Sequence, residues 1–487
     1  MPRWIWISGL CLLAALTIGI VILATHWPFS RDEITRALQK ATSRPVQIGA
    51  FRSTYFPPGC QAENVRVLHN SNPEATPLIT LDRLTIRATF AGLFRPTKRL
   101  EQVTVAGMRI VIPPKGSKDG TAKFALDSGD KSIEIGTIVA NGAVLEFRSS
   151  DPGEEPYRIH IDALSLAGVG SGKPWRYRAV LNLSEPPGVI RAEGEFGPWN
   201  PDDPGSAPAS GEYTYSDVNL GAFRGISGTL HAKGKFRGPL AKVETEGALE
   251  VPNFHVDKSG SVVPLHASYH ATVNGTNGEV RLDAVETRFF RTALTARGTV
   301  DKRGAILDVA VARGRIDDIL RLFVEEKAAP LSGAVQLHAK FVWPPGEEKF
   351  LRKIRMDIGF GIDGARFRSE TTQGTIDRLS QGKDDPQTVL SDLRGGVAFR
   401  NGVASFRNVT FDVPGASADI HGTYGLIDHR VELHGVLHTT GKLSDAATGF
   451  KALVLKAISP FFKKKDEVKI VPFKITGTFK DAKVGLD

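Results

Sequence analysis

Apolar and polar residues alternate over long stretches of this chain. The longest stretch runs from Ile354 to Ile362, where every second residue is Ile, Met or Phe and the residues between are charged or glycine. Shorter stretches of the same kind begin at Leu84, Ala143 and Leu307. Successive side chains of a β-strand point to opposite faces of its sheet, so this period predicts strands with one apolar and one polar face.

Asn-Gly pairs predict tight turns between these strands, because the two-residue turns of β-hairpins need residues with positive φ. The pairs are Asn141-Gly142, Asn274-Gly275, Asn277-Gly278 and Asn401-Gly402. We therefore expect a long antiparallel meander.

The chain also contains an internal repeat. Gly278–Val300 aligns without gaps on Gly402–Tyr424, with Gly298-Thr299 matching Gly422-Thr423. Repetition of one supersecondary unit favours an elongated array of strands over a compact globule.

Three segments have a helical period instead. Ser30 and Glu33 have the spacing of a capping box and precede a short amphipathic helix that ends before Pro45. Arg315–Glu326 is the second candidate helix. The third, residues 444–459, is expected to plug or cap the sheet, and the alternative is a helix on a membrane surface, favoured by its lysines.

Few helices are thus available to cover the apolar faces of on the order of 30 strands. Two sheets can pack as a sandwich, a sheet can close into a barrel, or one long sheet can curl and leave its apolar face as a groove. A transmembrane barrel is disfavoured, because nearly every strand would need a lipid-facing apolar band of about ten residues. Periodicity leaves the sandwich and the groove open.

The run Ile5–Ala24 has 20 residues and no charge. At about 1.5 Å per residue it spans roughly 30 Å, the thickness of a bilayer core, and Trp4, Trp6 and Trp27 flank it. We expect a retained single-pass anchor rather than a cleaved signal peptide, because no small-x-small cleavage site follows the run. The residues expected to anchor the chain in the membrane are Ile5, Leu12, Leu13, Leu16, Ile18, Ile20, Val21, Ile22 and Leu23.

Charge and cysteine content restrict the partners. The net charge of +9 is spread over 487 residues. This mild excess fits anionic lipid head groups, and no dense Lys/Arg cluster lies beside an aromatic platform for nucleic acid. Cys11 and Cys60 are the two cysteines, and Cys11 lies inside the apolar run, which excludes a disulfide framework. Few cysteines in an exported chain fit a bacterial periplasm.

No motif for catalysis or metal binding is evident. The chain lacks a Gly-x-Ser-x-Gly elbow, a His-Glu-x-x-His sequence and a paired-cysteine site. His266 and His270 lie four residues apart, as do His434 and His438, which in a strand separates their side chains by roughly 13 Å. We expect no enzyme activity, no catalytic residue, no cofactor and no metal.

The order of several short motifs resembles the bacterial AsmA-like proteins. At the N-terminus, the apolar run and the short helix precede Arg44-Pro45-Val46-Gln47-Ile48-Gly49. Toward the C-terminus the motifs are Asn401–Phe406, Val413–Ala416, Gly422–Tyr424, Thr448–Lys451, Pro460–Phe462 and Pro472–Thr478. The resemblance covers both ends of the chain, and the middle by pattern only.

This resemblance implies a mostly β protein of the bacterial inner membrane, with the bulk of the chain in the periplasm. An N-terminal transmembrane helix would precede an elongated, curled antiparallel sheet, a repeating β-groove like that of bridge-like lipid-transfer proteins. The expected segments are an anchor at 1–28, an amphipathic helix at 29–45, groove segments at 46–200 and 201–400, and an AsmA-like C-terminal segment at 401–487.

The implied function is to carry phospholipid, or another envelope lipid, toward the outer membrane. The alternative is an envelope scaffold that assists outer-membrane protein assembly or outer-membrane integrity without lipid transport, and outer-membrane or envelope proteins are possible partners of either. The residues expected to line the groove are Leu84, Ile86, Leu145, Phe147, Leu181, Leu183, Leu307, Val309, Ile354, Met356, Ile358, Phe360, Ile362, Val431 and Leu433.

Overall fold

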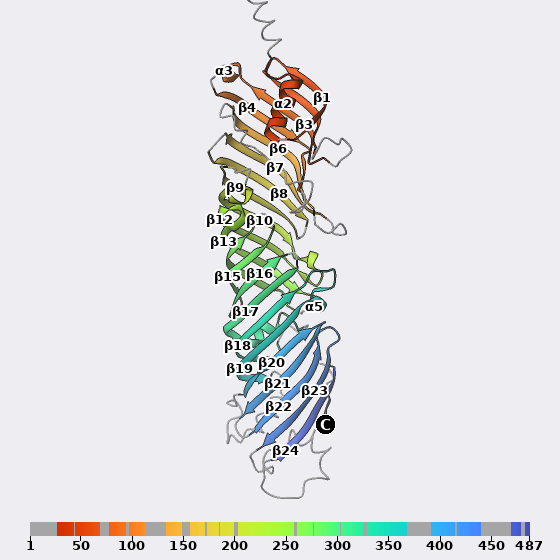
Figure 1. The fold of residues 1–487 in the computed structure, drawn as a ribbon. Coiled ribbons are helices and arrows are strands. Elements are labelled where there is room, and N and C mark those ends of the chain that lie inside the picture. The colour runs from red at the N-terminus through yellow and green to blue at the C-terminus, as the bar shows by residue number, and fades with distance from the viewer. Residues whose placement is uncertain are drawn as a thin grey trace, which may run out of the picture. The chain divides into compact units, whose positions relative to one another are not determined.

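The computed structural model describes residues 27–487 with gaps (Figure 1). The gaps are 43, 69–76, 94–96, 113–132, 149–155, 171–172, 185, 199–202, 258–260, 276, 302, 325–328, 368–390, 414–415, 440–468 and 479–482. The predicted anchor and the helix predicted at 444–459 lie outside the described residues. None of the helices that the structure describes is both long enough and apolar enough to cross a membrane.

The described chain is mostly β. Its 25 strands belong by hydrogen-bond pairing to one sheet, and its helices are few and short. Two compact units are distinguished, Met1–Leu183 with Ile190–Glu212 and Ser184–Val189 with Tyr213–Asp487, called here the first and the second unit.

The elements of the first unit are α2 (Arg31–Thr42), β1 (Val46–Thr54), β2 (Gly59–Val67), β3 (Ile79–Ala88), α3 (Phe90–Leu93), β4 (Lys98–Ala106), β5 (Arg109–Ile112), β6 (Ile133–Phe147), β7 (Tyr157–Val169) and β8 (Trp175–Ser184). Strands β9 (Pro187–Phe196) and β10 (Pro208–Asn219) contribute residues to both units, as β8 does through Ser184, and the short 3₁₀ helix η1 (Pro204–Ser206) lies between β9 and β10 in the chain.

The elements of the second unit are η2 (Leu220–Phe223), β11 (Ile226–Ser227), β12 (Thr229–Pro239), η3 (Leu240–Lys242), β13 (Val243–Val256), β14 (Val263–Val273), β15 (Val280–Phe289), β16 (Thr292–Asp301), β17 (Gly304–Arg315), α4 (Ile316–Leu320), β18 (Leu331–Trp343), α5 (Phe350–Lys353), β19 (Arg355–Phe367), β20 (Ser391–Arg400), β21 (Val403–Val413), β22 (Ala416–Gly425), β23 (Arg430–Thr439), β24 (Lys469–Thr478) and β25 (Lys483–Leu486).

Strand β6 departs from the expected antiparallel meander. It pairs in parallel with β4 and then with β5. The prediction of a hairpin turn at Asn141-Gly142 was therefore wrong: this pair lies inside β6, with Gly142 at φ +68°, where the neighbour of β6 changes from β4 to β5. A parallel pairing needs a long connection, and residues 113–132 lie between β5 and β6.

The other Asn-Gly pairs lie in turns, as predicted. Asn401 and Gly402, at φ +53° and +79°, form the two-residue turn between β20 and β21. Asn274-Gly275 and Asn277-Gly278 lie in the connection from β14 to β15. Asn-Gly pairs adopt positive φ readily. This conformation forms a hairpin turn at Asn401-Gly402 and an irregularity within a strand at Asn141-Gly142.

The internal repeat corresponds to two equivalent hairpins, β15–β16 and β21–β22. Both carry a register shift at the matching position, after Leu282 in the first and after Phe406 in the second. The matching glycines Gly298 and Gly422 have φ of +153° and +137°. The repeated sequence therefore encodes a hairpin together with its irregularity.

Helix α2 confirms the helix expected after the anchor. The Ser30 hydroxyl accepts a hydrogen bond from the Glu33 backbone N–H at 3.3 Å, which is one half of a capping box. The Glu33 carboxylate pairs with Arg36 instead of returning to Ser30. Ile34 faces inward and belongs to a closed core with Trp27 and residues of β1 to β6.

Helix α4 is shorter than the predicted helix Arg315–Glu326. It ends at Leu320, where the N–H groups of Leu322 and Phe323 bond to carbonyls three residues back. Such bonds tighten the last turn of a helix and end it.

Within the second unit the sheet curls. Seven strand-to-strand steps separate β10 from β18, roughly 34 Å along a flat sheet. Yet the Phe223 ring meets the Trp343 ring with centroids 4.8 Å apart, and the Phe350 N–H donates to the Arg224 carbonyl at 2.7 Å. The ends of these strands are therefore brought together by the curvature of the sheet.

We expect Gly298→Ala and Gly422→Ala to destabilise the protein by similar amounts, about 1–3 kcal/mol each from backbone strain alone. Both positions have positive φ, and an added Cβ would collide with a backbone oxygen of the next strand, that of Ile306 or Glu432. Denaturant unfolding of each variant measures the loss.

Gly359→Ala serves as the matched control, because a Cβ at Gly359 meets no atom within 4 Å. It should leave the free energy of unfolding within about 0.5 kcal/mol of the wild type. Clearly unequal losses at Gly298 and Gly422 would contradict the equivalence of the two hairpins, and losses no larger than that of Gly359→Ala would contradict the strain.

Candidate functional site

A row of uncharged residues crosses the second unit from β12 to β25. The printed strand registers connect fourteen residues, one on each strand, called here the central row. Its members are Gly234, Gly247, Tyr269, Val285, Ala296, Val309, Ala339, Ile358, Val397, Phe406, Gly422, Leu433, Ile475 and Val484. Measured along the sheet, the row extends roughly 60 Å at about 4.8 Å per strand.

Most side chains of the central row whose burial the structure describes are half-buried; Ala339, 5% exposed, is buried. Val309, Ile358 and Leu433 are partly accessible, whereas Asp308 and Asp357 on the other face are exposed. In a sandwich, a second sheet would cover such a face completely. The described strands belong to one sheet, so the apolar face of the second unit is shielded by the curl of that sheet and, locally, by clusters that include α4 and α5.

Most residues predicted to line a groove in the second unit do share this face. Val309, Ile358 and Leu433 belong to the central row itself. A parallel row, traced through the registers, connects Leu307, Phe341, Met356, Phe399, Ala404, Tyr424 and Val431. Phe360 and Ile362 continue the same face of β19, Phe360 half-buried and Ile362 buried.

Ile354 is different, because it precedes β19 and is only 1% exposed. It packs with Phe399 and Ala404 in a closed cluster beside α5. This predicted lining residue is part of a core.

The first unit divides its predicted lining residues between two environments. Leu84 and Ile86 are buried in the core that α2 closes. Leu145, Leu181 and Leu183 are half-buried on their strands. Phe147 lies in β6, opposite Tyr157 of β7. The apolar face beneath α2 is therefore filled by protein side chains.

A chain of hydroxyl groups crosses the apolar face of the second unit and was not predicted. The Thr245 hydroxyl donates to the Lys235 carbonyl at 3.0 Å, so the Tyr213 hydroxyl, 3.1 Å away, donates to Thr245. The Tyr269 hydroxyl then donates to Tyr213. Every hydroxyl hydrogen in this chain thus has an acceptor.

Glycines make room for the two tyrosines. Gly234 and Gly247 are paired across β12 and β13, between the strands that carry Tyr213 and Tyr269. A Cβ on Gly234 would lie 2.9 Å from the Tyr213 hydroxyl. The recurrent sequence of glycine, a polar residue and an aromatic residue, as in Gly211-Glu212-Tyr213, is the signal that could have indicated this arrangement.

Burial raises the pKa of Tyr269, and the hydrogen bond with Tyr213 raises it further. In the first unit, burial raises the pKa of Tyr177 to about 12. Both phenols therefore stay neutral over the whole physiological range, as expected for hydroxyls that serve as structural donors.

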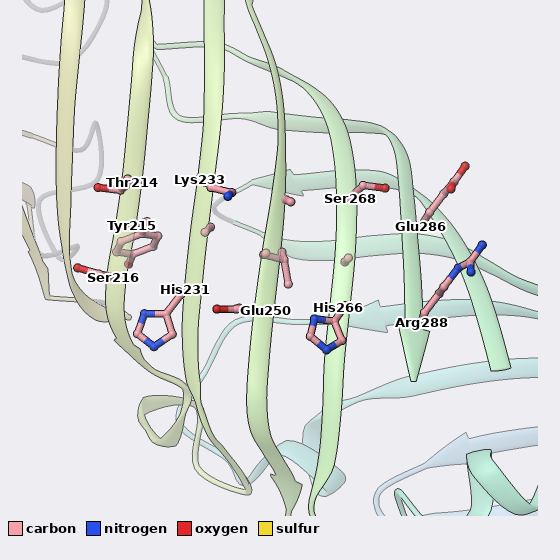
Figure 2. Close-up of a pocket in the computed structure, with 14 residues that line it drawn as sticks. Thr214, Tyr215, Ser216, His231, Lys233, Glu250, His266, Ser268, Glu286 and Arg288 are labelled. Carbon is pink, nitrogen blue, oxygen red and sulfur yellow. The ribbon is translucent and has the colours of Figure 1, made fainter. Parts of the chain in front are cut away.

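Two concave regions lie on the polar face of the second unit. The larger, of about 520 Å³, is crossed by two rows of side chains on adjacent strands (Figure 2). One row is His231, Glu250, His266 and Arg288, and the other is Lys233, Ala248, Ser268 and Glu286. Its charges are mixed in sign. Among the residues that the structure describes, no group of three or more His, Cys, Asp or Glu side chains is placed to hold a metal ion.

The second concave region, of about 420 Å³, has a floor of bare backbone. Gly359 and Gly396 are paired there, and His338, Lys340 and Arg407 stand around them. Both regions are open and are lined mainly by residues of the polar face, although Ile358 and Val397 of the central row also border the second one.

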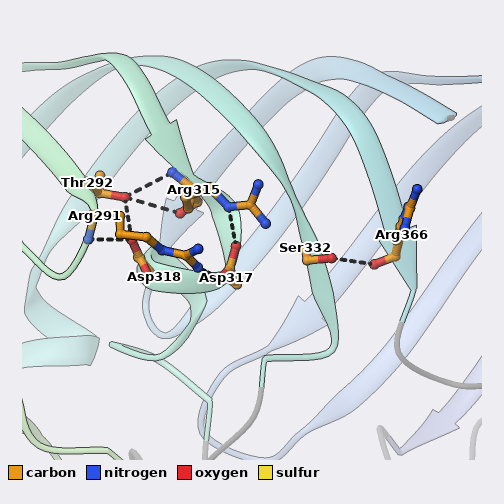
Figure 3. A network of polar contacts seen from close by, with 7 residues as sticks. All are labelled: Arg291, Thr292, Arg315, Asp317, Asp318, Ser332 and Arg366. Carbon is orange, nitrogen blue, oxygen red and sulfur yellow. Dashed lines mark hydrogen bonds and ion pairs between the residues drawn. The ribbon is translucent and has the colours of Figure 1, made fainter.

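The carboxylate of Asp318, in α4, is buried and is hydrogen-bonded by neighbouring residues (Figure 3). It accepts hydrogen bonds from the Arg291 backbone N–H at 3.0 Å and from the Thr292 hydroxyl at 2.9 Å. The Thr292 hydroxyl in turn accepts from the Arg315 N–H at 2.9 Å. This network ties α4 to the turn between β15 and β16, which is a structural role.

Glu146, the other buried acidic residue of the described chain, is surrounded by arginines. Arg109, Arg148 and Arg158 all pair with its carboxylate. Burial alone would raise the pKa of Glu146, but hydrogen bonds from Arg109 and Arg158 outweigh burial and lower it. A carboxylate held ionised by three cations is poorly suited to act as a general acid.

Cys60 is free, as expected from the sequence, and is buried. Burial raises the pKa of its thiol to about 12, so the reactive thiolate is scarce at neutral pH.

Comparisons with models of known protein families and with curated proteins found no match to this chain. The class of protein must therefore be inferred from the sheet and its apolar face.

We expect Tyr213→Phe to destabilise the protein more than Tyr269→Phe. Removing the middle hydroxyl leaves the Tyr269 hydroxyl without its acceptor, which costs about 1–3 kcal/mol, whereas removing the last donor costs about 0.5–1.5 kcal/mol. Denaturant unfolding of both variants at neutral pH measures the two losses of stability. A larger loss for Tyr269→Phe would contradict the direction assigned to the hydrogen bonds among the three hydroxyls.

The raised pKa of Tyr269 also predicts a loss of stability at high pH. The unfolded phenol ionises near its ordinary pKa of 10.0, before the folded one does, so the free energy of unfolding should fall as the pH rises above 10. The decline should be shallower in Tyr269→Phe. An identical decline in both proteins would show that Tyr269 does not contribute.

Proposed function

We propose that this protein binds the acyl chains of lipids on the apolar face of its sheet and carries phospholipid, or another envelope lipid, between membranes. The observation that carries the proposal is the central row, which crosses fourteen strands without a charged residue and is half-buried at most of its described side chains. A face of this kind in water needs an apolar cover, and an acyl chain supplies one.

The energetics support a mobile lipid rather than a fixed one. Each buried CH₂ contributes about 0.8 kcal/mol, and that contribution does not depend on which apolar side chain supplies the contact. Ile358, Val397 and Phe406 follow one another on adjacent strands, so an acyl chain that moves by one strand exchanges similar contacts. Binding is then spread over the face, with no residue that is essential by itself.

The same proposal includes the cellular location of the protein. The 20-residue uncharged run Ile5–Ala24 serves as a single-pass anchor in the bacterial inner membrane, and the sheet lies in the periplasm as an elongated groove. The AsmA-like motifs at both ends of the sequence support this assignment. Outer-membrane or other envelope proteins would receive the lipid.

An envelope scaffold without lipid transport is the second candidate. The observation that favours it is the pair of concave regions on the polar face, about 520 and 420 Å³ in volume, which offer charged side chains to a protein partner. A scaffold would bind its protein partner through the polar face, and no lipid would occupy the apolar face.

We expect Ile358→Asp to reduce the phospholipid that co-purifies with the full chain by at least about half, because a carboxylate among acyl chains is costly to bury. Mass spectrometry of the intact protein, with lipid extraction and quantification, measures the lipid per chain. Ile358→Ala should have a smaller effect, since it leaves the face apolar.

Gly359→Asp is the matched control. Gly359 is the next residue along the strand, lies on the polar face and has open space around its Cβ position. It introduces the same charge and should leave the lipid content unchanged. Equal lipid content in Ile358→Asp, Gly359→Asp and the wild type, or a stable lipid-free wild type, would contradict the proposal and favour the scaffold.

A further inference from the structure

Aromatic side chains are exposed at one edge of the first unit, beside Trp27, the first residue that the structure describes. Phe56, in the turn between β1 and β2, is 87% exposed, the highest value among the large apolar side chains that the structure describes. Its neighbour Tyr55 is 48% exposed. The Phe56 ring packs against Phe90 of α3, with centroids 5.6 Å apart. Exposing so much aromatic surface to water is unfavourable, which indicates an apolar partner.

The same edge receives the chain from the predicted anchor. The Trp27 ring lies 5.0 Å from the Tyr55 ring and 5.8 Å from the Phe29 ring. Two residues, Thr25 and His26, separate Trp27 from the end of the apolar run at Ala24, a span of about 10 Å at most. If that run spans a bilayer, the bilayer surface lies within about 10 Å of Trp27 and hence of Tyr55.

The buried indole of Trp27 adds a second observation. The Trp27 side chain is only 6% exposed, and its Nε1–H has no hydrogen-bond acceptor among the described residues. Buried indole N–H groups normally find a partner. A tryptophan directly after the predicted anchor also fits the enrichment of tryptophan at membrane boundaries.

Basic residues complete the edge. Arg87 lies opposite Gly59, directly after the turn that holds Phe56, and Lys98 and Arg99 begin β4 beside α3. All three are exposed, and none forms an ion pair with a described residue. The sequence from Arg83 to Leu100 contains no acidic residue. Cations beside exposed aromatic rings suit an anionic lipid surface.

We propose that this edge, formed by Trp27, Tyr55, Phe56 and Phe90 with Arg87, Lys98 and Arg99, rests in the interface of the membrane that holds the anchor. Phe56 enters the boundary between head groups and acyl chains, and the three cations meet anionic phosphates. The inference rests on the proposed anchor, and it adds a second contact that fixes how the first unit stands on the bilayer.

The test places a fluorescent label at position 56 of the full-length protein. Phe56→Cys in a Cys11→Ala background leaves Cys60 as the other thiol, and Cys60 is buried and labels slowly. The protein is reconstituted into nanodiscs of phosphatidylethanolamine and phosphatidylglycerol, with and without a spin-labelled lipid that quenches at interface depth. Leu13→Cys marks the anchor, and His160→Cys marks an exposed position on β7.

We expect the spin-labelled lipid to quench the label at position 56 by about twofold or more and to leave the label at His160 unchanged, as for a side chain at interface depth. Replacing Arg87 and Lys98 together by Glu should reduce the quenching at position 56 in the anionic discs. A label that only packs against the protein at position 56 would not respond to these charges.

Two results would overturn the inference. If the label at Leu13 is quenched by deeper spin-labelled lipid but the label at position 56 behaves like that at His160, the anchor stands and the edge does not touch the membrane. If neither Leu13 nor position 56 is quenched, the anchor itself fails and the edge loses its basis with it.

Discussion

A sheet with one apolar and one polar face has to keep the apolar face from water, and the way each part of this protein does so determines the rest of its structure. Fully burying a Val, Leu, Ile or Phe side chain contributes about 1.5–3 kcal/mol, so a face that stays half-buried forgoes a large part of that stabilisation at every strand. In the first unit, α2 with Trp27 and Phe29 closes the face into a core. In the second unit, the described residues provide only local clusters and the curl of the sheet.

The second unit shows how an incompletely covered face can still be stable. Contacts at its edges, such as Phe223 with Trp343 and the hydrogen bond from Phe350 to Arg224, hold strands that are far apart along the sheet. The hydroxyl chain of Tyr213, Tyr269 and Thr245 braces β10, β13 and β14 without leaving a donor unsatisfied. The sheet is thus fixed from its edges and by polar bonds, which leaves the central row accessible.

Much of this fold was predictable from sequence, because alternation and turn chemistry are local signals. The period-two pattern from Met356 to Ile362, the Asn401-Gly402 hairpin and the helix after Ser30 were all confirmed. The repeat extended further than expected, since Gly298 and Gly422 match in backbone conformation as well as in sequence.

What could not be predicted depended on contacts between distant residues. Asn141-Gly142 has the local chemistry of a hairpin turn, but parallel neighbours for β6 make it an irregularity within a strand. Leu84 and Leu307 have the same alternating pattern, yet only the structure shows that α2 buries the former. The hydroxyl chain joins residues up to 56 positions apart, a separation at which no sequence spacing indicates contact.

The central claim is that lipid lies along one face of the sheet, and photo-crosslinking through successive residues tests it most directly. A benzoylphenylalanine would be placed in turn at Asp308, Val309, Asp357, Ile358, Glu432 and Leu433 of the full-length protein, which would then be irradiated in cells and examined by mass spectrometry for lipid adducts. The account predicts adducts at Val309, Ile358 and Leu433 and none at the three acidic positions, so that labelling follows the alternation of the strands. Adducts at both sets or at neither would contradict it.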